Sequence, residues 1–482
     1  MSDTPFTPSL SSNLRALKEL LGDSFDLIVR ELAVAGTKAY AICFDGMCDE
    51  LKIAEALIKP LTDPALKKPP DGTLFEAVRD RLYKGTDVKT VYTVPDAAQA
   101  ALDGNLVLLA EKEPAALTFS VQGYPRRSVG EPLSEQNEKG TQEGFTDNFK
   151  DNVTLLRRRL RTPLLSTELL TAGDTSQTPV VLCFIRGRAD AAMLAQVKNR
   201  LQTAKLDAAL GAGCLRPFLE DRRPGLFKGT GVTERPDTLA AMLTEGRIGV
   251  IVDGVPYAVI VPYLFSDHFH TADDYLSGPA YAVFMRALRV ACVATAAALP
   301  GFFVAVCVFH PEIIPSDIMF DIAKAESKTP FPLMAEALII HLIYEVVREA
   351  GLRMPVAVGH AVSIVGALVI GDTAVTAGLI GAPMLIVVAL TAVCSSVAVR
   401  LHETVSLIRF ALILIGGLTG LYGVMLFSGL MLTELCAVAP FGVPFSAPVS
   451  PFVKAAQQDT LLRAGWRKLG RRVTTVKEMK FE

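Results

Sequence analysis

The sequence predicts an α/β cytosolic region of two related subdomains followed by an α-helical multi-pass membrane domain. The first observation behind this prediction is charge distribution. Residues 287–453 hold only 17 of the 98 charged side chains (48 Lys and Arg plus 50 Asp and Glu) in a chain of 482 residues with mean hydropathy +0.36. Such a charge-poor half is typical of a membrane domain. The second observation is an internal repeat in the polar half.

A formal charge of −2 is too balanced for a dedicated nucleic-acid binder, so no nucleic-acid partner is expected.

The segment 1–25 is predicted to be a short tail and a helix. Met1–Ser12 is rich in Ser, Thr and Pro, and the charged, helix-like run Asn13–Leu21 follows it. A secretory signal would carry a basic residue and an apolar core at this place. The large polar half is therefore expected to stay in the cytoplasm.

The polar half contains the same elements twice in the same order. The strand-like run KAYAICF at 38–44 leads into apolar residues at helical spacing in 49–61, and PVVLCFI at 179–185 leads in the same way into 189–201. The corresponding cysteines, at positions 43 and 183, are 140 residues apart. The repeat predicts two α/β subdomains of related build, which lie at 26–125 and 165–280.

The second part of each copy reads Pro-Asp, a short helix, a Gly break, a strand, a tight turn and another strand. Asp96 and Asp237 are expected to cap these helices, because an Asp side chain accepts hydrogen bonds from the free amides of a first turn. Gly104 and Gly246 are expected to end the helices in the left-handed conformation.

Between the copies lies a charged linker with an arginine-rich helix, residues 126–164. Acidic residues in its first part are expected to pair with the arginine run Arg157–Arg161 when the linker folds back. A run of arginines is commonly a solvated helix face, and an anionic partner or the membrane surface is the functional alternative.

The membrane domain is predicted at 281–453. Uncharged runs of 20, 18, 27 and 24 residues approach or exceed what is needed to cross about 30 Å of hydrocarbon at about 1.5 Å per residue. A fifth stretch, 331–347, is interrupted by charges, and a sixth, 435–453, contains four prolines and is expected to be an irregular return. The uncharged runs are residues 290–309, 354–371, 373–399 and 410–433.

Both chain ends are predicted to be cytosolic. The tail 454–482 carries eight Lys and Arg against three acids, and Arg286 and Arg289 precede the first span. The positive-inside rule then places both ends in the cytoplasm. Two ends on one side require an even number of crossings.

Ionisable side chains within the apolar stretches are candidates for an ion path, because they cost several kcal/mol unless they face a partner or a cavity. Glu336, His341, Glu345 and Asp372 are such residues, and His341 and Glu345 lie four apart on one helix face, where they can pair. The alternative is that these charges reach water at the interface.

Small residues recur every four positions in this part of the chain, at Ser363, Ala367 and Gly371 and again at 374, 378 and 382. Such spacing lets helices approach closely, so the segment either packs tightly against another helix or lines a pore.

Catalytic and metal-binding motifs are missing from the sequence. It has no Walker loop and no G-x-S-x-G elbow, and its eight cysteines have irregular spacing, so an enzyme, a cofactor and a structural metal are not expected. His268 and His270 are alternate residues and would share a face on a strand, but without further ligands they predict no metal site.

An ordered series of blocks resembles the GerA spore-germination receptor family, in its A-subunit branch. The resemblance covers about residues 35–470. Its blocks include EPLSE at 131–135, GTQEGFTDN at 140–148, NVTLLRRRLRTPLL at 152–165, ERPDTLAAMLTEGRIGVIVDGVPYAVIVP at 234–262, DDYLSGP at 273–279 and FHPEIIPSDIMFDIAKAESKTPFPLMAEAL at 309–338.

The resemblance implies a multi-pass protein of the spore inner membrane that assembles with B and C subunits, and a homo-oligomer of A subunits around a cation-conducting path opened by a nutrient. It also implies subdomain or subunit contacts for the family signature residues, which are Arg157, Arg158, Arg159, Glu234, Arg235 and Asp237. Two alternatives remain from the sequence. One is an amplifier channel of the same family associated with dipicolinate release, and the other is a secondary transporter, which the broken apolar segments would also suit.

Overall fold

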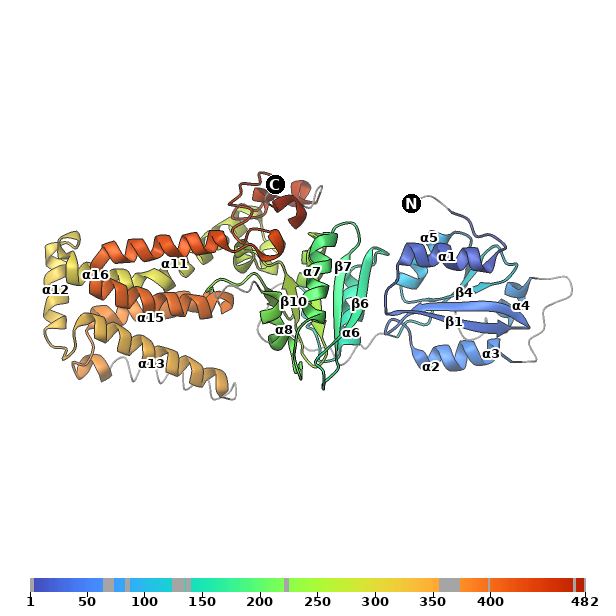
Figure 1. The fold of residues 1–482 in the computed structure, drawn as a ribbon, viewed down its shortest axis with the longest axis horizontal. Helices are drawn as coiled ribbons and strands as arrows, with labels where there is room; N and C mark the ends of the chain where they lie inside the picture. Colours follow the sequence, from blue (N-terminus) through green and yellow to red (C-terminus); the bar gives the residue numbers. More distant parts are fainter. Residues whose placement is uncertain are drawn as a thin grey trace.

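The chain forms three bodies in a row along one long axis (Figure 1). A computed structural model describes residues 4–63, 73–82, 87–123, 135, 140–220, 225–354, 373–397, 399–470 and 474–480. Two α/β subdomains lie at one end and in the middle, and a bundle of apolar helices lies at the other end. The predicted fold class is confirmed.

The first subdomain is a five-stranded antiparallel sheet in the order β1-β2-β4-β5-β3. β1 and β2 are joined by a two-residue turn at Ala35 and Gly36, which have φ of 48° and 76°, as the tightest hairpin turns require. α1 and α5 cover one face and α2 to α3 lie at the other (Figure 1). The elements are α1 Leu10–Leu21, β1 Leu27–Val34, β2 Thr37–Phe44, α2 Glu50–Lys52, η1 Ile53–Ile58, α3 Lys59–Leu61, α4 Leu74–Leu82, β3 Val88–Val91, α5 Val94–Leu102, β4 Leu106–Ala110 and β5 Ala116–Phe119.

The second subdomain repeats this sheet in the equivalent order β6-β7-β9-β10-β8. Alternating residues of β7 face opposite sides: Val181 and Cys183 pack with α6 and α9, whereas Val180 and Leu182 pack with α7 and α8. The elements are α6 Phe149–Arg159, β6 Leu165–Ala172, β7 Thr178–Ile185, α7 Ala191–Gln202, α8 Ala212–Leu219, β8 Gly231–Thr233, α9 Pro236–Thr244, β9 Ile248–Val252 and β10 Ala258–Val261.

The predicted helix caps need a correction. Thr93 caps α5, since its Oγ1 accepts a hydrogen bond from the Asp96 N–H and donates to the Asp96 carboxylate at 2.6 Å. Asp237 lies in the first turn of α9, whose cap position is Arg235. The Pro in each motif occupies the first turn, which shifts the Asp inside the helix. The expectation for Gly104 and Gly246 is confirmed, with φ of 83° and 85°.

In the part of the chain that the structure describes, α11, α13, α15 and α16 form the helical bundle, and the short helix α12 lies across its far end (Figure 1). Among the described residues, α11 and α16 are long and apolar enough to cross a membrane. α11 and α16 approach closely, because a Cβ on Gly416 would stand 2.4 Å from the carbonyl oxygen of Gly301. The elements are α10 Ala272–Leu276, α11 Pro279–Phe309, η3 Pro311–Ile313, α12 Ser316–Glu326, α13 Leu333–Arg353, α15 Ala382–Val397, η4 Val399–Leu401 and α16 His402–Ala437.

The axis of α16 reverses at Gly420, whose φ of 67° and ψ of −156° are not helical. Leu412 and Val424 consequently pack in one cluster, although a straight helix would hold them about 18 Å apart. Both ends of α16 then meet the same residue of the second subdomain. Thr404 near the start donates to the Leu226 carbonyl at 2.8 Å, and Glu434 near the end accepts from the Leu226 N–H at 2.6 Å. The expectation of a single span over 410–433 is therefore wrong, because the run is a helical hairpin.

Two other membrane expectations also change. The run 373–399 is not one helix, since a turn with Gly378 at φ 66° precedes α15, so positions 374, 378 and 382 do not form one helical stripe. The proline-rich stretch after α16 is not an irregular return within the membrane. Phe441, Val443 and Ala447 are buried in the core of the second subdomain, because the prolines end the helix and turn the chain onto α7 and α8.

Candidate functional site

A buried polar network joins α11, α13, α15 and α16 at the end of the bundle nearest the α/β subdomains. Arg409 of α16 has no exposed side-chain area, and its Nε donates to the Ala296 carbonyl of α11 at 2.8 Å. Its remaining nitrogens donate to Ser395 of α15 and to Glu345 of α13. A buried guanidinium needs such partners, because an unpaired charge in an apolar bundle costs several kcal/mol.

Glu345 of α13 faces α16 and not His341, which lies one turn earlier on its own helix. It accepts a hydrogen bond from Ser406, and its Oε2 lies 3.2 Å from His402 Nε2, besides its contact with Arg409. The expected pair of His341 and Glu345 is therefore not formed. His341 is fully buried, its Nδ1 lies 2.8 Å from the Ala337 carbonyl one turn earlier, and its Nε2 has no partner among the described residues.

Glu336 lies at the opposite end of the bundle. Its side chain is buried, and Oε1 accepts a hydrogen bond from the Gly381 N–H at 2.8 Å. The alternative in which this charge reaches water does not hold for Glu336. The other expected ion-path residues, Ser363, Gly371 and Asp372, lie outside the described residues.

The arginine run connects the two subdomains. Arg157 is buried and binds Asp26, which precedes β1, with Nη2 2.7 Å from Oδ1. Thr167 of β6 donates to the same carboxylate at 2.7 Å, and the guanidinium stacks over the Phe44 ring at 4.2 Å. The expectation of a solvated face is thus wrong for Arg157, because the folding of the linker places it between the sheets.

Arg158 and Arg159 form the predicted pairs with an acidic residue of the linker. Arg158 and Arg159 both pair with Glu143 of the linker, and their side chains are about one-third exposed. This is the predicted pairing of acidic and basic linker residues. Such partly exposed pairs contribute less than the buried one.

The Glu234–Asp237 block forms a second buried contact. Arg235 donates to the Asp237 carboxylate at 2.7 Å and to the Thr141 carbonyl at 2.8 Å. Burial acts to raise the pKa of Asp237, but the hydrogen bond and charge of Arg235 outweigh it and hold that pKa below its ordinary value. Beside this block, the Glu234 N–H donates to Glu135 at 3.1 Å.

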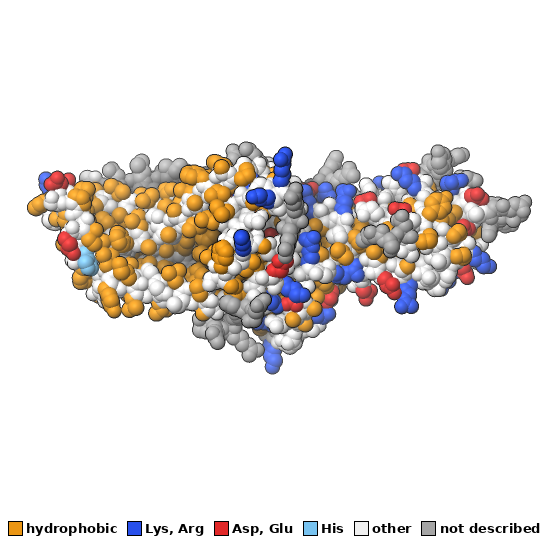
Figure 2. Space-filling view, turned by 90° about the horizontal axis from the view of Figure 1, so that it is seen from above, with side chains coloured by type: hydrophobic (Ala, Val, Ile, Leu, Met, Phe, Trp, Pro, Cys, Tyr) orange, Lys and Arg blue, Asp and Glu red, His pale blue; other side chains and the backbone are white. Residues whose placement is uncertain are grey.

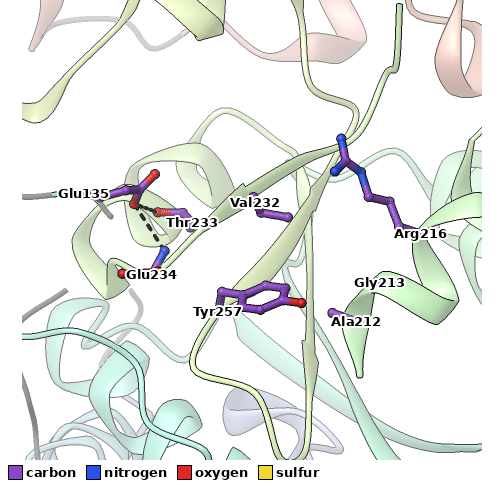
Figure 3. A pocket seen from close by; sticks show the side chains of 8 residues that line it. All are labelled: Glu135, Ala212, Gly213, Arg216, Val232, Thr233, Glu234 and Tyr257. Carbon is purple, nitrogen blue, oxygen red and sulfur yellow. Dashed lines mark hydrogen bonds between the residues drawn. The ribbon is translucent and has the colours of Figure 1, made fainter. Parts of the chain in front are cut away.

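A pocket of 270 Å³ opens between α8 and β8 next to this contact (Figure 3). Glu135 accepts hydrogen bonds from Thr233 and Glu234 on one side, and the Tyr257 ring and the start of α8 form the other side. The volume is slightly below that of ordinary small-molecule sites, which begin at about 300 Å³. The lining residues are Glu135, Ala212, Gly213, Arg216, Val232, Thr233, Glu234 and Tyr257.

Glu135 also connects the linker to the bundle. Arg400, in the turn before α16, donates to Glu135 and, at 2.7 Å, to the Tyr263 hydroxyl of the second subdomain. Burial raises the pKa of Tyr263 to about 12, so its hydroxyl stays protonated at neutral pH. Linker, second subdomain and α16 therefore meet at one set of hydrogen bonds.

Charged pairs also anchor the start of α11. Arg286 is fully buried and binds Asp274 at 3.2 Å and Asp459 of the C-terminal segment at 3.0 Å, and Arg289 binds Asp274 at 2.8 Å. Burial acts to raise the pKa of Asp274, but the hydrogen bonds and charges of these arginines hold it below its ordinary value.

His268 and His270 do not lie on a strand. The sequence suggested that they would share the face of one, and this expectation is wrong. They lie in and just after the 3-10 helix η2, Phe265–Phe269, and burial lowers the pKa of His268 to about 3. His268 packs against Tyr263 and Phe445, whereas His270 contacts the Thr460 carbonyl at 2.8 Å.

Arg409 and Glu326 were not among the residues predicted from the sequence. Arg409 directly precedes the uncharged run 410–433, and an arginine between two apolar stretches was a usable signal. Glu326 is the last residue of the short helix α12 and lies beside Glu336. It is outside the apolar stretches of the sequence, so nothing in the sequence pattern pointed to it.

The chain matches known proteins over nearly its whole length. The family described as Bacillus/Clostridium GerA spore germination protein matches residues 15–475. Spore germination protein KA of Bacillus subtilis (strain 168) is 35% identical over 466 residues, which cover 95% of this chain and 85% of that protein. Spore germination protein B1 of the same organism is 30% identical over 471 residues, 96% of each chain.

One solved structure is also similar. The crystal structure of the N-terminal domain of the A subunit of the Bacillus megaterium spore germinant receptor GerK3 is 25% identical to this chain, with a TM-score of 0.44, and the match covers 55% of this chain and 99% of that domain. Because the family match extends over 15–475, this chain belongs to the GerA family of spore germination proteins.

Proposed function

We propose that this chain is a membrane subunit of a spore germinant receptor that oligomerises and couples nutrient sensing to cation release as a ligand-gated ion channel. The observation that carries the proposal is the build of the bundle. The face of the bundle seen in Figure 2 is largely apolar, whereas Arg409, His341 and Glu336 are buried between its helices and Glu345 is half-buried beside Arg409. Ionisable groups in that position are typical of ion pathways.

The described helices support a multi-pass topology. α11 begins at the subdomain end, where its Arg286 binds Asp274, and ends at Phe309, which lies against the α16 turn at Gly420. α13 runs back from the far end to the subdomain end. α15 starts beside Glu336 at the far end and also runs back to the subdomain end. α16 runs from the subdomain end to the far end and back again. With the uncharged run 354–371 as a further span, which is a prediction from the sequence, the total is six and both chain ends are cytosolic.

The surface of the bundle suits lipid and neighbouring subunits. Ile386, Tyr422 and Met425 have exposed fractions of 70%, 76% and 70%. In Figure 2 hydrophobic side chains cover the bundle, whereas Lys, Arg, Asp and Glu gather over the two subdomains. Copies of this chain and B and C subunits are the proposed partners, and the spore inner membrane is the proposed location.

The contacts between the bundle and the second subdomain provide a route for coupling. Leu226 holds both ends of α16, and Arg400 ties its start to Glu135 and Tyr263. A ligand that favours one arrangement of these contacts by a few kcal/mol would shift the population of open channels.

A Glu336→Gln variant is expected to change the rate or selectivity of cation release while the receptor still assembles. Gln is similar in shape and its carbonyl still accepts from the Gly381 N–H, so the variant mainly removes a negative charge from the proposed path. The measurement is potassium and sodium release from spores after nutrient addition, with the receptor level determined in the same spores. Unchanged release of both cations at normal receptor level would exclude Glu336 from the path. Asp372→Asn tests the second predicted path residue in the same way.

A further inference from the structure

Two carboxylates meet at the far end of the bundle. Glu326 is the last residue of α12, Glu336 lies in the first turn of α13, and both approach Gly381, just before α15. A Cβ built on Gly381 would stand 2.6 Å from Glu326 Oε1 and 3.5 Å from Glu336 Oε1. The carboxylates therefore occupy the space that a larger side chain at position 381 would fill.

One oxygen of each carboxylate is enclosed and has no hydrogen-bond donor. These atoms are Oε1 of Glu326 and Oε2 of Glu336, and neither has a partner among the described residues. Glu336 as a whole is only 1% exposed. Two adjacent carboxylates in a medium of low dielectric constant cannot both remain charged without a positive group between them.

The surrounding helices decide which residue holds a proton. Glu336 accepts from the Gly381 N–H, and the N-terminal ends of α13 and α15 place positive partial charge beside it. Glu326 lies at the C-terminal end of α12, where the partial charge is negative. Burial first, and then the negative charge of Glu336, raise the pKa of Glu326 to about 8. Cys307 of α11 is a further titratable group nearby, and the charge of Glu326 acts on it.

We propose that Glu326 and Glu336 form a binding site for one proton, in which the Glu326 carboxyl group holds the proton and donates it in a hydrogen bond to Oε2 of Glu336. Release of the proton to water leaves two carboxylates facing each other, and their repulsion favours separation of α12 from α13 and α15. The consequence for cation release, a dependence on pH, rests on the proposed function, whereas the proton site itself does not.

The test is infrared difference spectroscopy of the purified full-length chain in lipid nanodiscs. The difference between wild type and Glu326→Gln at about pH 6 is expected to contain the C=O stretch of one protonated carboxyl group. This band is expected to disappear as the pH rises through about 8. In Glu336→Gln the neighbouring charge is gone, so the Glu326 band is expected to titrate at a lower pH.

Glu312→Gln is the matched control, because Glu312 is an exposed glutamate in the same loop region between α11 and α12. Its band of the protonated carboxyl group at about pH 6 is expected to equal that of the wild type. If Glu326→Gln does not fold, the titration of the wild type decides, since the site requires a protonated carboxyl band that titrates near pH 8.

No protonated carboxyl band at about pH 6, or a band that Glu326→Gln leaves unchanged, overturns the proposal. These outcomes are separate from the fate of the proposed function. A normal band in a chain that spores do not need for cation release would retain the proton site and reject the receptor role. If the band is missing but spores need the chain for cation release, the proton site is rejected and the receptor role is retained.

Discussion

An Asp26→Ala variant is expected to have a free energy of unfolding about 3–5 kcal/mol below that of the wild type. The change leaves Arg157 buried between the two sheets without its ionic partner, and Thr167 loses its acceptor. Because Arg157 lies in the linker helix and Asp26 precedes the first sheet, the two subdomains should also separate more readily. Thermal unfolding and limited proteolysis of the linker in the purified chain measure these two effects.

Glu143→Ala is the matched control, since it removes the partner of two arginines of the same helix that are about one-third exposed. The expected cost is at most about 1 kcal/mol. The double variant Asp26→Ala/Arg157→Met should recover much of the lost stability, because it removes the buried charge as well. Equal losses for Asp26→Ala and Glu143→Ala would contradict the structural role of the buried pair.

A Glu345→Gln variant is expected to destabilise the bundle by about 3 kcal/mol and to reduce the amount of receptor in the membrane. It removes the negative charge beside the fully buried Arg409 and leaves the guanidinium with neutral acceptors on α11 and α15. The measurements are the thermal unfolding midpoint of the chain in nanodiscs and the level of the chain in spore membranes. Glu349→Gln is the control, because Glu349 is on the same helix but pairs with Arg353 at the surface, where both side chains are more than half exposed.

The double variant Glu345→Gln/Arg409→Gln separates charge burial from packing. It is expected to be more stable than Glu345→Gln alone, since no uncompensated charge remains. If the single and double variants have the same midpoint, the ion pair does not determine the stability of the bundle.

The two sheets were predictable because local pattern determines them. The runs at 38–44 and 179–185 became β2 and β7, and the glycines after α5 and α9 have the expected positive φ. The repeat predicted two subdomains of related build, and the two sheets have equivalent strand orders. These features depend on residues close in sequence, where side-chain alternation and turn chemistry act.

The partners of the charged residues were not predictable, because they come from distant parts of the chain. Arg157 binds Asp26, 131 residues away, and Arg409 contacts Ala296, 113 residues away. The sequence pattern identified the arginine run at 157–161 and the end of an uncharged run at Arg409. It did not identify the residues that contact these arginines in the folded chain. The reversal of α16 had a weak local signal, since Gly420 lies inside a Gly-rich run that hydropathy alone interprets as one helix.

The most direct test of the receptor role uses spores that lack this gene, in a strain without a redundant paralogue. Potassium and dipicolinate release are followed after single nutrients and after mixtures, with the wild-type gene restored as the control. A receptor subunit predicts loss of the response to one class of nutrient, with the others intact and the loss reversed by the restored gene. Uniform slowing of every response would instead indicate an amplifier, and unchanged release with every nutrient would contradict a role in germinant sensing and cation release.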